Sequence, residues 1–170
     1  AKGFPALEFL FFSDADDNTV VNSFVTDTYA INRRLYIRSV VQDIKVLSEK
    51  IHTAWSPAGD DYAKSFKEAT GTSVGSATSD LVNNLNNDID MLKRYKIGIP
   101  AGIIGGQIRA TNFEAFHSGF SKELLKANVQ AQKNVFTGGT GQGLDDYLNF
   151  LEAQRNGQPL APAITAKYDE

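Results

Sequence analysis

The stretch that decides the fold is residues 36–55, YIRSVVQDIKVLSEKIHTAW. Apolar side chains recur in it at spacings of three and four, at Tyr36, Val40, Ile44, Leu47, Ile51 and Trp55. This period places them on one face of an α-helix. We expect the helix to begin near Ser23 and to stop at Ser56-Pro57, because proline cannot continue it. A helix of about thirty residues is typical of a helical bundle.

Three further segments repeat this helical pattern. A second long helix, ending near Lys96, is predicted from Val74, Ala77, Leu81, Leu85, Ile89 and Leu92. A third is predicted from Phe120, Leu124, Ala127, Ala131 and Val135, with Ser121 as its N-cap and Gly138-Gly139 as its stop. A shorter fourth is predicted from Leu144, Tyr147, Leu148 and Leu151. Period-two alternation is scarce, so the sequence predicts an all-α, up-and-down helical bundle.

Composition and charge narrow the class of protein. The chain has 170 residues, of which 42% are hydrophobic, and it has no cysteine. We expect a single domain over residues 1–170 that buries roughly two-thirds of its unfolded surface. The missing cysteines exclude disulfides and thiolate chemistry. A net charge of −3 argues against a nucleic-acid partner, and no apolar run reaches the roughly 18 residues of a membrane span.

The segment 97–120 between the second and third helices is rich in glycine. Its length is unusual for a connection without a task, so we expect it to be functional or packed over the bundle. It lacks the Gly-Lys-Ser/Thr ending of a phosphate-binding loop and follows a helix rather than a strand. A tight structural turn is therefore the better interpretation of Gly98 to Gly106.

Acidic residues at Asp14, Asp16 and Asp17 suggest an oxygen-rich cation loop. The EF-hand template fails here, because its sixth position is Thr19 instead of Gly and its twelfth is Val25 instead of Glu. We interpret the segment as a solvated turn with a helix N-cap nearby.

Residues 3–12, GFPALEFLFF, place a single carboxylate in an apolar helix. Pro5 suits the first helical position, where its missing N–H is not needed, and Glu8 follows one turn later. An ionised carboxylate buried without a partner is costly, so it must be paired, protonated, bound to a ligand or turned to solvent. Glu8 therefore either points outward, pairs with an arginine such as Arg33 or Arg34, or belongs to a binding site.

The same residues resemble the G-x-H-x-x-E signature of imelysin-like proteins, with Gly3 and Glu8 in register. Further pieces that resemble the family follow in order, at Arg33-Arg34-Leu35-Tyr36, the helix ending at Trp55, Lys96-Ile97-Gly98-Ile99-Pro100, Glu114-Ala115-Phe116-His117-Ser118 and Gly143-Leu144-Asp145-Asp146-Tyr147-Leu148. The resemblance implies a duplicated fold of two helical bundles, of which this chain looks like the second half. Because the chain opens without Met and runs at once into apolar residues, we expect a processed or truncated chain. Its missing N-terminal half would then be a partner.

The resemblance also implies where such a protein works and with what. It implies a bacterial cell-envelope protein of the periplasm, outer membrane or cell surface. Such a protein is often a lipoprotein and is connected with iron uptake. Contact with a membrane would come only through a lipid anchor outside this chain. The family is named for an insulin-cleaving activity, and its site is taken to lie between the two bundles.

This chain departs from the signature, because Pro5 stands at the histidine position. Residues three apart share a helix face, so a His and a Glu at that spacing could hold one metal ion. Proline offers no ligand atom, and a catalytic zinc usually needs three protein ligands, whereas the sequence has two histidines, His52 and His117. We therefore expect no catalytic residues. Ligand binding would fall to Gly3, Pro5 and Glu8, with Glu8 the one signature residue able to hold iron or another divalent metal.

Six further residues are candidate contributors to this site: Arg33, Arg34, Gly98, Pro100, Glu114 and His117. The first two could neutralise Glu8 or an acidic ligand, although a solvated helix face explains them as well. Glu114 and His117 are three residues apart and could face Glu8, although a loop histidine is more often structural.

Three functions remain open from the sequence. The first is a non-catalytic envelope binding protein whose ligand is a metal, or a carbohydrate, peptide or small anion in its place. The second is a metal-dependent peptidase that takes ligands from the missing half. The third is a structural or assembly module of the envelope.

Overall fold

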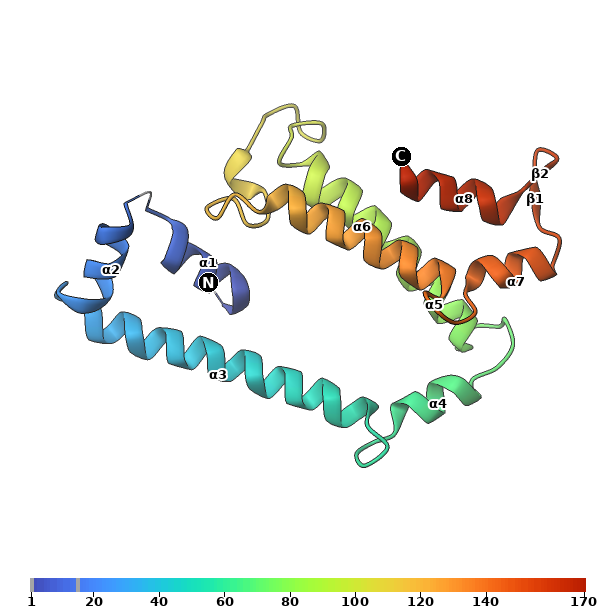
Figure 1. Ribbon diagram of the computed structural model, residues 1–170, viewed down its shortest axis with the longest axis horizontal. Coiled ribbons are helices and arrows are strands. Elements are labelled where there is room, and N and C mark those ends of the chain that lie inside the picture. The colour runs from blue at the N-terminus through green and yellow to red at the C-terminus, as the bar shows by residue number, and fades with distance from the viewer. Residues whose placement is uncertain (1, 15) are drawn as a thin grey trace.

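The computed structural model describes residues 2–14 and 16–170, and within them the fold is all-α, as predicted. Its α-helices are α1 (Gly3–Phe12), α2 (Asp17–Val25), α3 (Ala30–Trp55), α4 (Tyr62–Glu68), α5 (Ala77–Met91), α6 (Ser121–Thr137), α7 (Leu144–Phe150) and α8 (Leu160–Asp169) (Figure 1). A π-helix η1 (Leu92–Gly98), a 3₁₀ turn η2 (Ala110–Asn112) and the short antiparallel strands β1 (Gln154–Arg155) and β2 (Gln158–Pro159) complete it. No described helix combines the length and apolar character needed to cross a bilayer.

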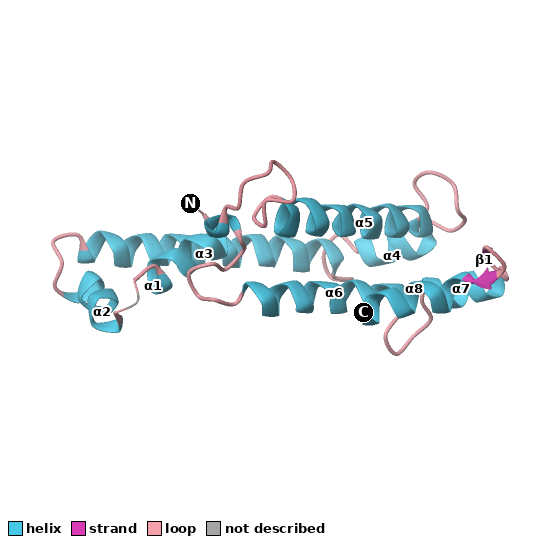
Figure 2. Ribbon diagram, turned by 90° about the horizontal axis from the view of Figure 1, so that it is seen from above, coloured by secondary structure: helices cyan, strands magenta, loops and turns pink. Residues whose placement is uncertain are grey.

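The helices form two groups, which we call the first arm (α1–α4) and the second arm (α5–α8). In the first arm, α3 packs against α1, α2 and α4. In the second arm, α5 pairs with α6, while α7 and α8 pack against α6 and against each other. Figure 1 shows α3 along one side of the molecule and the α5–α6 pair along the other, and in Figure 2 these long helices all run along the length of the molecule.

The two arms leave much of the apolar surface uncovered. The chain exposes 12423 Å², whereas a compact protein of its mass exposes about 8,200 Å². It thus buries only a little over half of its unfolded surface, so the expectation of two-thirds is wrong. The buried apolar residues of the two arms are Ala6, Ala30, Val40, Phe136 and Ala161, and Pro100 is buried in the segment between the arms. No closed core forms among the described residues.

The long helix α3 begins at Ala30 and not near Ser23, because a turn separates it from α2. In that turn the Asp27 carboxylate accepts hydrogen bonds from the Tyr29 backbone N–H and from Arg33 Nη1, both at 2.7 Å. Arg33 also donates to the carbonyl of Ser23 at 2.9 Å and so ties α3 to α2. The end of α3 at Trp55, just before Ser56-Pro57, confirms the predicted stop.

The Asp27 turn gives a prediction about acid pH. The hydrogen bond from Tyr29 N–H, and after it the Arg33 guanidinium, hold the pKa of the Asp27 carboxyl below its ordinary value. A lowered folded-state pKa means that the stabilisation is present above the ordinary value of 3.8 and is lost as the pH falls through the lowered pKa. We expect the α2–α3 turn to loosen only below about pH 4, seen as rising amide exchange at Tyr29. The Asp27→Asn variant should lack this acid transition, and an unchanged transition in that variant would assign it to another group.

The ends of α5 and α6 show which local signals determine where a helix begins or ends. Val74 continues the predicted stripe but lies outside α5 and is 99% exposed, because Ser76 caps the helix by accepting from Ser79 N–H. The start of α6 at Ser121 agrees with the prediction, but Ser121 is not its cap: its hydroxyl donates to the carbonyl of Glu114 instead. Gly138, in the left-handed region at φ 70°, ends α6 as predicted.

The acidic turn before α2 is a helix cap, as interpreted from the sequence. Asp16 accepts hydrogen bonds from the backbone N–H groups of Asn18 and Thr19. A hydrogen bond from the Thr19 hydroxyl, and after it these two backbone bonds, lower the pKa of the Asp16 carboxyl. The oxygens of Asp16 are thus engaged in starting a helix.

Candidate functional site

Glu8 joins the first arm to the segment 97–120. It lies half-buried on α1, and its Oε1 accepts a hydrogen bond of 2.6 Å from the backbone N–H of Ser118. Pro5 is the third residue of α1, still inside the first turn where no N–H partner is needed, and Gly3 opens the helix with φ +66°.

A second contact lies directly beside this hydrogen bond. The His117 ring meets Phe9 edge-to-face, with ring centroids 5.3 Å apart, and it meets Phe116 in the same way at 5.3 Å. Two consecutive residues of α1 thus contact two consecutive residues of the segment 97–120: Glu8 contacts Ser118, and Phe9 contacts His117. We call these five residues the Glu8 site. Phe9, Phe116 and His117 are all exposed, so the site is reachable from solvent.

Gly98 and Pro100 shape the segment that reaches Glu8. A Cβ on Gly98 would lie 2.8 Å from Ile104 Cδ1 and 2.9 Å from the Lys93 carbonyl oxygen, so only glycine fits. Pro100 is fully buried, and its carbonyl accepts from the N–H of Arg109 at 2.9 Å. The segment therefore begins with a packed turn, although residues 103–112 that follow it are exposed. Gly98 and Pro100 act through the backbone of this turn rather than through a surface that a ligand could touch.

Glu114 and His117 do not act as a pair. The Glu114 carboxylate binds Lys96 Nζ at 3.0 Å, which links the end of η1 to the later part of the segment. His117 makes the aromatic contacts described above. The spacing of three residues is not a shared face here, because the residues between them form turns rather than a helix.

Arg33 and Arg34 are engaged with partners other than Glu8. Arg33 binds Asp27 and the Ser23 carbonyl, and Arg34 donates to the carbonyl of Phe24. Both hold α2 onto α3. Within residues 2–14 and 16–170 the structure gives Glu8 no ion pair, so its partner is a backbone N–H and not one of the arginines that the sequence offered as candidates.

A comparison with protein-family models finds one described as imelysin, which matches residues 1–170. The chain belongs to the imelysin family. The family that the sequence pieces predicted is thereby confirmed. Neither the curated proteins nor the solved structures include a match to this chain.

The residues at the imelysin signature do not fit a self-contained metal centre. Pro5 replaces the histidine, and one oxygen of Glu8 is already bonded to Ser118. No group of three histidine, aspartate or glutamate side chains that could hold a metal occurs among the described residues. A catalytic zinc site generally takes three protein ligands, so the metal expected from the family would need ligands from elsewhere.

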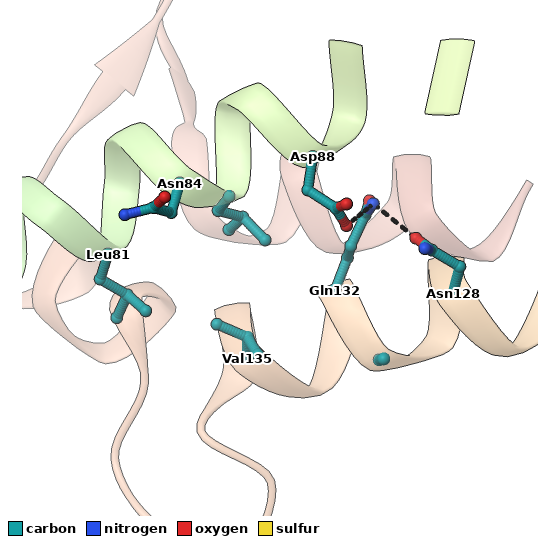
Figure 3. Close-up of a pocket in the computed structure, with 8 residues that line it drawn as sticks. Leu81, Asn84, Asp88, Asn128, Gln132 and Val135 are labelled. Carbon is teal, nitrogen blue, oxygen red and sulfur yellow. Dashed lines mark hydrogen bonds between the residues drawn. The ribbon is translucent and has the colours of Figure 1, made fainter. Parts of the chain in front are cut away.

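Sequence reasoning missed a polar network in the second arm. A hollow of about 280 Å³ lies between α5 and α6, and Gln132 sits in its wall (Figure 3). Buried Gln132 donates to Asp88 Oδ2 at 2.6 Å and to Asn128 Oδ1 at 2.8 Å. These bonds join α6 to α5, so we assign the network to holding the two helices together.

The site residues missed from the sequence are Ser118, Phe9 and Phe116. Ser118 acts through its backbone N–H, which every residue except proline carries, so side-chain chemistry gives no sign of it. Phe9 and Phe116 could have been found, because each is a chain neighbour of a predicted site residue. Lys96 lies in one of the segments that resemble the family, but its ion pair with Glu114 was not foreseen.

Proposed function

We propose that this chain binds a ligand without cleaving it, as part of a bacterial envelope protein engaged in the uptake of iron or another metal. The proposed location, in the periplasm or on the outer membrane or cell surface as a lipoprotein, rests on the imelysin-family resemblance.

The observation that carries the binding role is the fixed orientation of Glu8. Ser118 N–H engages Oε1, and within the described part of the chain Oε2 has no hydrogen-bond partner. A half-buried carboxylate with one free oxygen attracts hydrogen-bond donors and cations. It repels small anions, which removes one of the ligand classes left open by the sequence.

The surroundings of Glu8 favour a peptide as the ligand. Phe9 and Phe116 offer exposed aromatic surface on either side of His117. A peptide supplies both N–H donors for Glu8 and apolar side chains for these rings. Cleavage would need an activated water or a nucleophile, and the Glu8 site holds a single carboxylate and a histidine turned against two phenyl rings.

One experiment separates the three functions that the sequence left open. A fluorescently labelled unfolded peptide is mixed with the chain, with and without added Zn²⁺ or chelator. Binding is followed by anisotropy and cleavage by mass spectrometry in the same samples. We expect the peptide to bind and to remain intact under every condition. Loss of one charge-assisted hydrogen bond in Glu8→Gln should weaken binding by about tenfold or more.

The matched control is Glu114→Gln, a carboxylate of the same segment that is already paired with Lys96. It should leave peptide binding within about twofold of the unaltered chain. Chelator-sensitive cleavage that disappears in Glu8→Gln would establish a metal-dependent peptidase instead. Binding that is the same in Glu8→Gln and the unaltered chain would leave the signature with a purely structural role.

A further inference from the structure

A closed, uncharged loop follows η1. We call residues 101–108, AGIIGGQI, the Ile loop. Its two ends meet, because the carbonyl of Pro100 accepts a hydrogen bond of 2.9 Å from the N–H of Arg109. Gly102 has φ +74°, and a Cβ there would lie 2.8 Å from Ile108 N, so glycine is needed where the two sides of the loop come close. The shape of the Ile loop is therefore fixed by its own backbone.

The Ile loop presents aliphatic side chains to solvent. Ile103 is 76% and Ile108 74% exposed, and Figure 1 shows the connection after α5 projecting beyond the adjoining ends of α5 and α6. Gln107 is the one residue of the loop with a polar side chain. Single apolar residues on a surface are ordinary, whereas two isoleucines held outward by one rigid loop indicate a surface that another body covers.

The backbone of this turn pairs largely within itself. The N–H of Gly102 donates to the carbonyl of Ile99 at 3.1 Å, and the N–H of Ile104 donates to the carbonyl of Gly98 at 2.9 Å. The bond between Pro100 and Arg109 closes the base. A lipid environment accepts apolar side chains but penalises unpaired backbone groups. The loop can therefore enter the headgroup region of a bilayer at little cost to its backbone.

The charges beside the Ile loop are all positive. Four basic side chains and no acidic one lie in residues 91–113, namely Lys93, Arg94, Lys96 and Arg109, although the whole chain carries 17 basic and 20 acidic groups. The carboxylates at either edge, Asp90 and Glu114, pair with two of them. Among the residues that the structure describes, Lys93 and Arg109 are exposed and form no ion pair. These two cations are available to an anionic partner.

We propose that the Ile loop docks this chain onto an anionic lipid bilayer, with its isoleucines among the headgroups and with Lys93 and Arg109 against lipid phosphates. Exposed aliphatic side chains flanked by cations are the two features that hold a protein on such a surface. A protein partner would be read by aromatic anchors and specific hydrogen bonds, which the loop itself does not offer. This inference goes beyond the proposed function and does not depend on what Glu8 binds.

Vesicle binding tests the docking directly. The chain is mixed with vesicles of phosphatidylcholine alone, or of equal parts phosphatidylcholine and phosphatidylglycerol, and the bound fraction is read by co-sedimentation. We expect binding to the anionic vesicles to be at least about tenfold stronger than to the neutral ones, and to weaken as salt is added. Absence of binding, or equal binding to both kinds of vesicle, would overturn the proposal.

The role of the cations is tested by two matched double variants. Lys93→Gln with Arg109→Gln removes the two cations beside the Ile loop. Arg38→Gln with Lys50→Gln removes the same charge from exposed positions on α3. Each basic residue close to an anionic surface strengthens binding about fivefold. The first pair should therefore weaken binding at least about tenfold and the second less than about threefold. Equal effects would mean that net charge alone attracts the chain.

The role of the isoleucines is tested in the same way. Ile103→Gln with Ile108→Gln alters the Ile loop. Ile31→Gln with Ile51→Gln alters the same residue type on α3, where the two side chains are 60% and 63% exposed. All four side chains are exposed, so neither variant removes a core contact. We expect the loop variant to weaken vesicle binding at least about tenfold, because aliphatic surface stays in water, and the α3 variant to leave it unchanged. Equal effects would exclude insertion of the loop.

A fluorescent label identifies what covers the loop. The chain has no cysteine, so Ile103→Cys and Ile51→Cys can each carry one environment-sensitive nitrobenzoxadiazole group. Emission from the loop label should shift to shorter wavelength when anionic vesicles are added, while emission from the α3 label stays constant. The same shift on adding inorganic phosphate would assign the cations to a free anion. A shift on adding unlabelled chain without vesicles would assign the loop to a second copy. Either result would overturn the proposal.

Discussion

Replacing Glu8 by alanine should release the segment 97–120 from α1. The variant removes the only acceptor that the structure gives to Ser118 N–H in the described part of the chain. A hydrogen bond to a charged group contributes about 1.5–3 kcal/mol. We therefore expect amide exchange at Ser118 to accelerate by roughly ten- to a hundredfold, and the aromatic contact between Phe9 and His117 to loosen with it. Hydrogen exchange followed residue by residue by NMR measures both effects.

Two variants show whether the charge or the acceptor atom matters. Glu8→Gln keeps an oxygen that can accept from Ser118, so its exchange should lie much closer to that of the unaltered chain. Glu114→Ala breaks the exposed ion pair with Lys96 and should leave the Ser118 amide unchanged. Unaltered Ser118 exchange in Glu8→Ala would mean that the segment is held by its own backbone bonds alone.

Helix ends could be predicted where a residue type forbids continuation. Pro57 follows the end of α3, and Gly138 ends α6 with a positive φ. The start of α3 could not be predicted in this way, because apolar periodicity continues through the Asp27 turn. There a side chain accepts the backbone N–H that a helix would use otherwise. This competition between a side chain and a backbone carbonyl for one N–H leaves little trace in the sequence, yet it determines where α3 begins.

The place of Glu8 could be predicted only in part. A carboxylate in an apolar helix must find a partner, and the structure gives it one. The partner comes from a residue 110 positions away and is a backbone group. Arginines were natural candidates because they are visible in the sequence. A backbone N–H is available at almost every position, so its choice depends on where the packed turn at Gly98 and Pro100 brings the chain.

Periodicity also could not show what covers each apolar face. The α3 stripe is continuous in sequence, yet Val40 is buried and Ile51 is exposed. A period reports which side of a helix avoids water, while burial depends on another element being present to cover it. The large exposed area of this chain is therefore a property of its packing that composition does not reveal.

Gly143→Ala should destabilise the second arm strongly. A Cβ at this position would lie 2.3 Å from the Thr137 carbonyl carbon and 2.4 Å from both Gly138 N and the Phe136 carbonyl oxygen. All three are backbone atoms at the end of α6, so no side chain can move aside. Relief requires α7 to shift away from α6, next to buried Phe136. We expect a loss of about 3 kcal/mol or more, and a fall in Tm of roughly 6–12 °C, measured by circular dichroism.

Gly141→Ala is the matched control, because it lies in the same turn with nothing nearer to its Cβ than the Gly138 carbonyl oxygen at 3.6 Å. It removes one glycine from the unfolded chain without a clash, so its stability should be unchanged or up to about 1 kcal/mol higher. Equal losses in the two variants would mean that the turn tolerates no side chain for reasons of flexibility. A loss confined to Gly143 would show that the close backbone approach between α6 and α7 sets the position of α7.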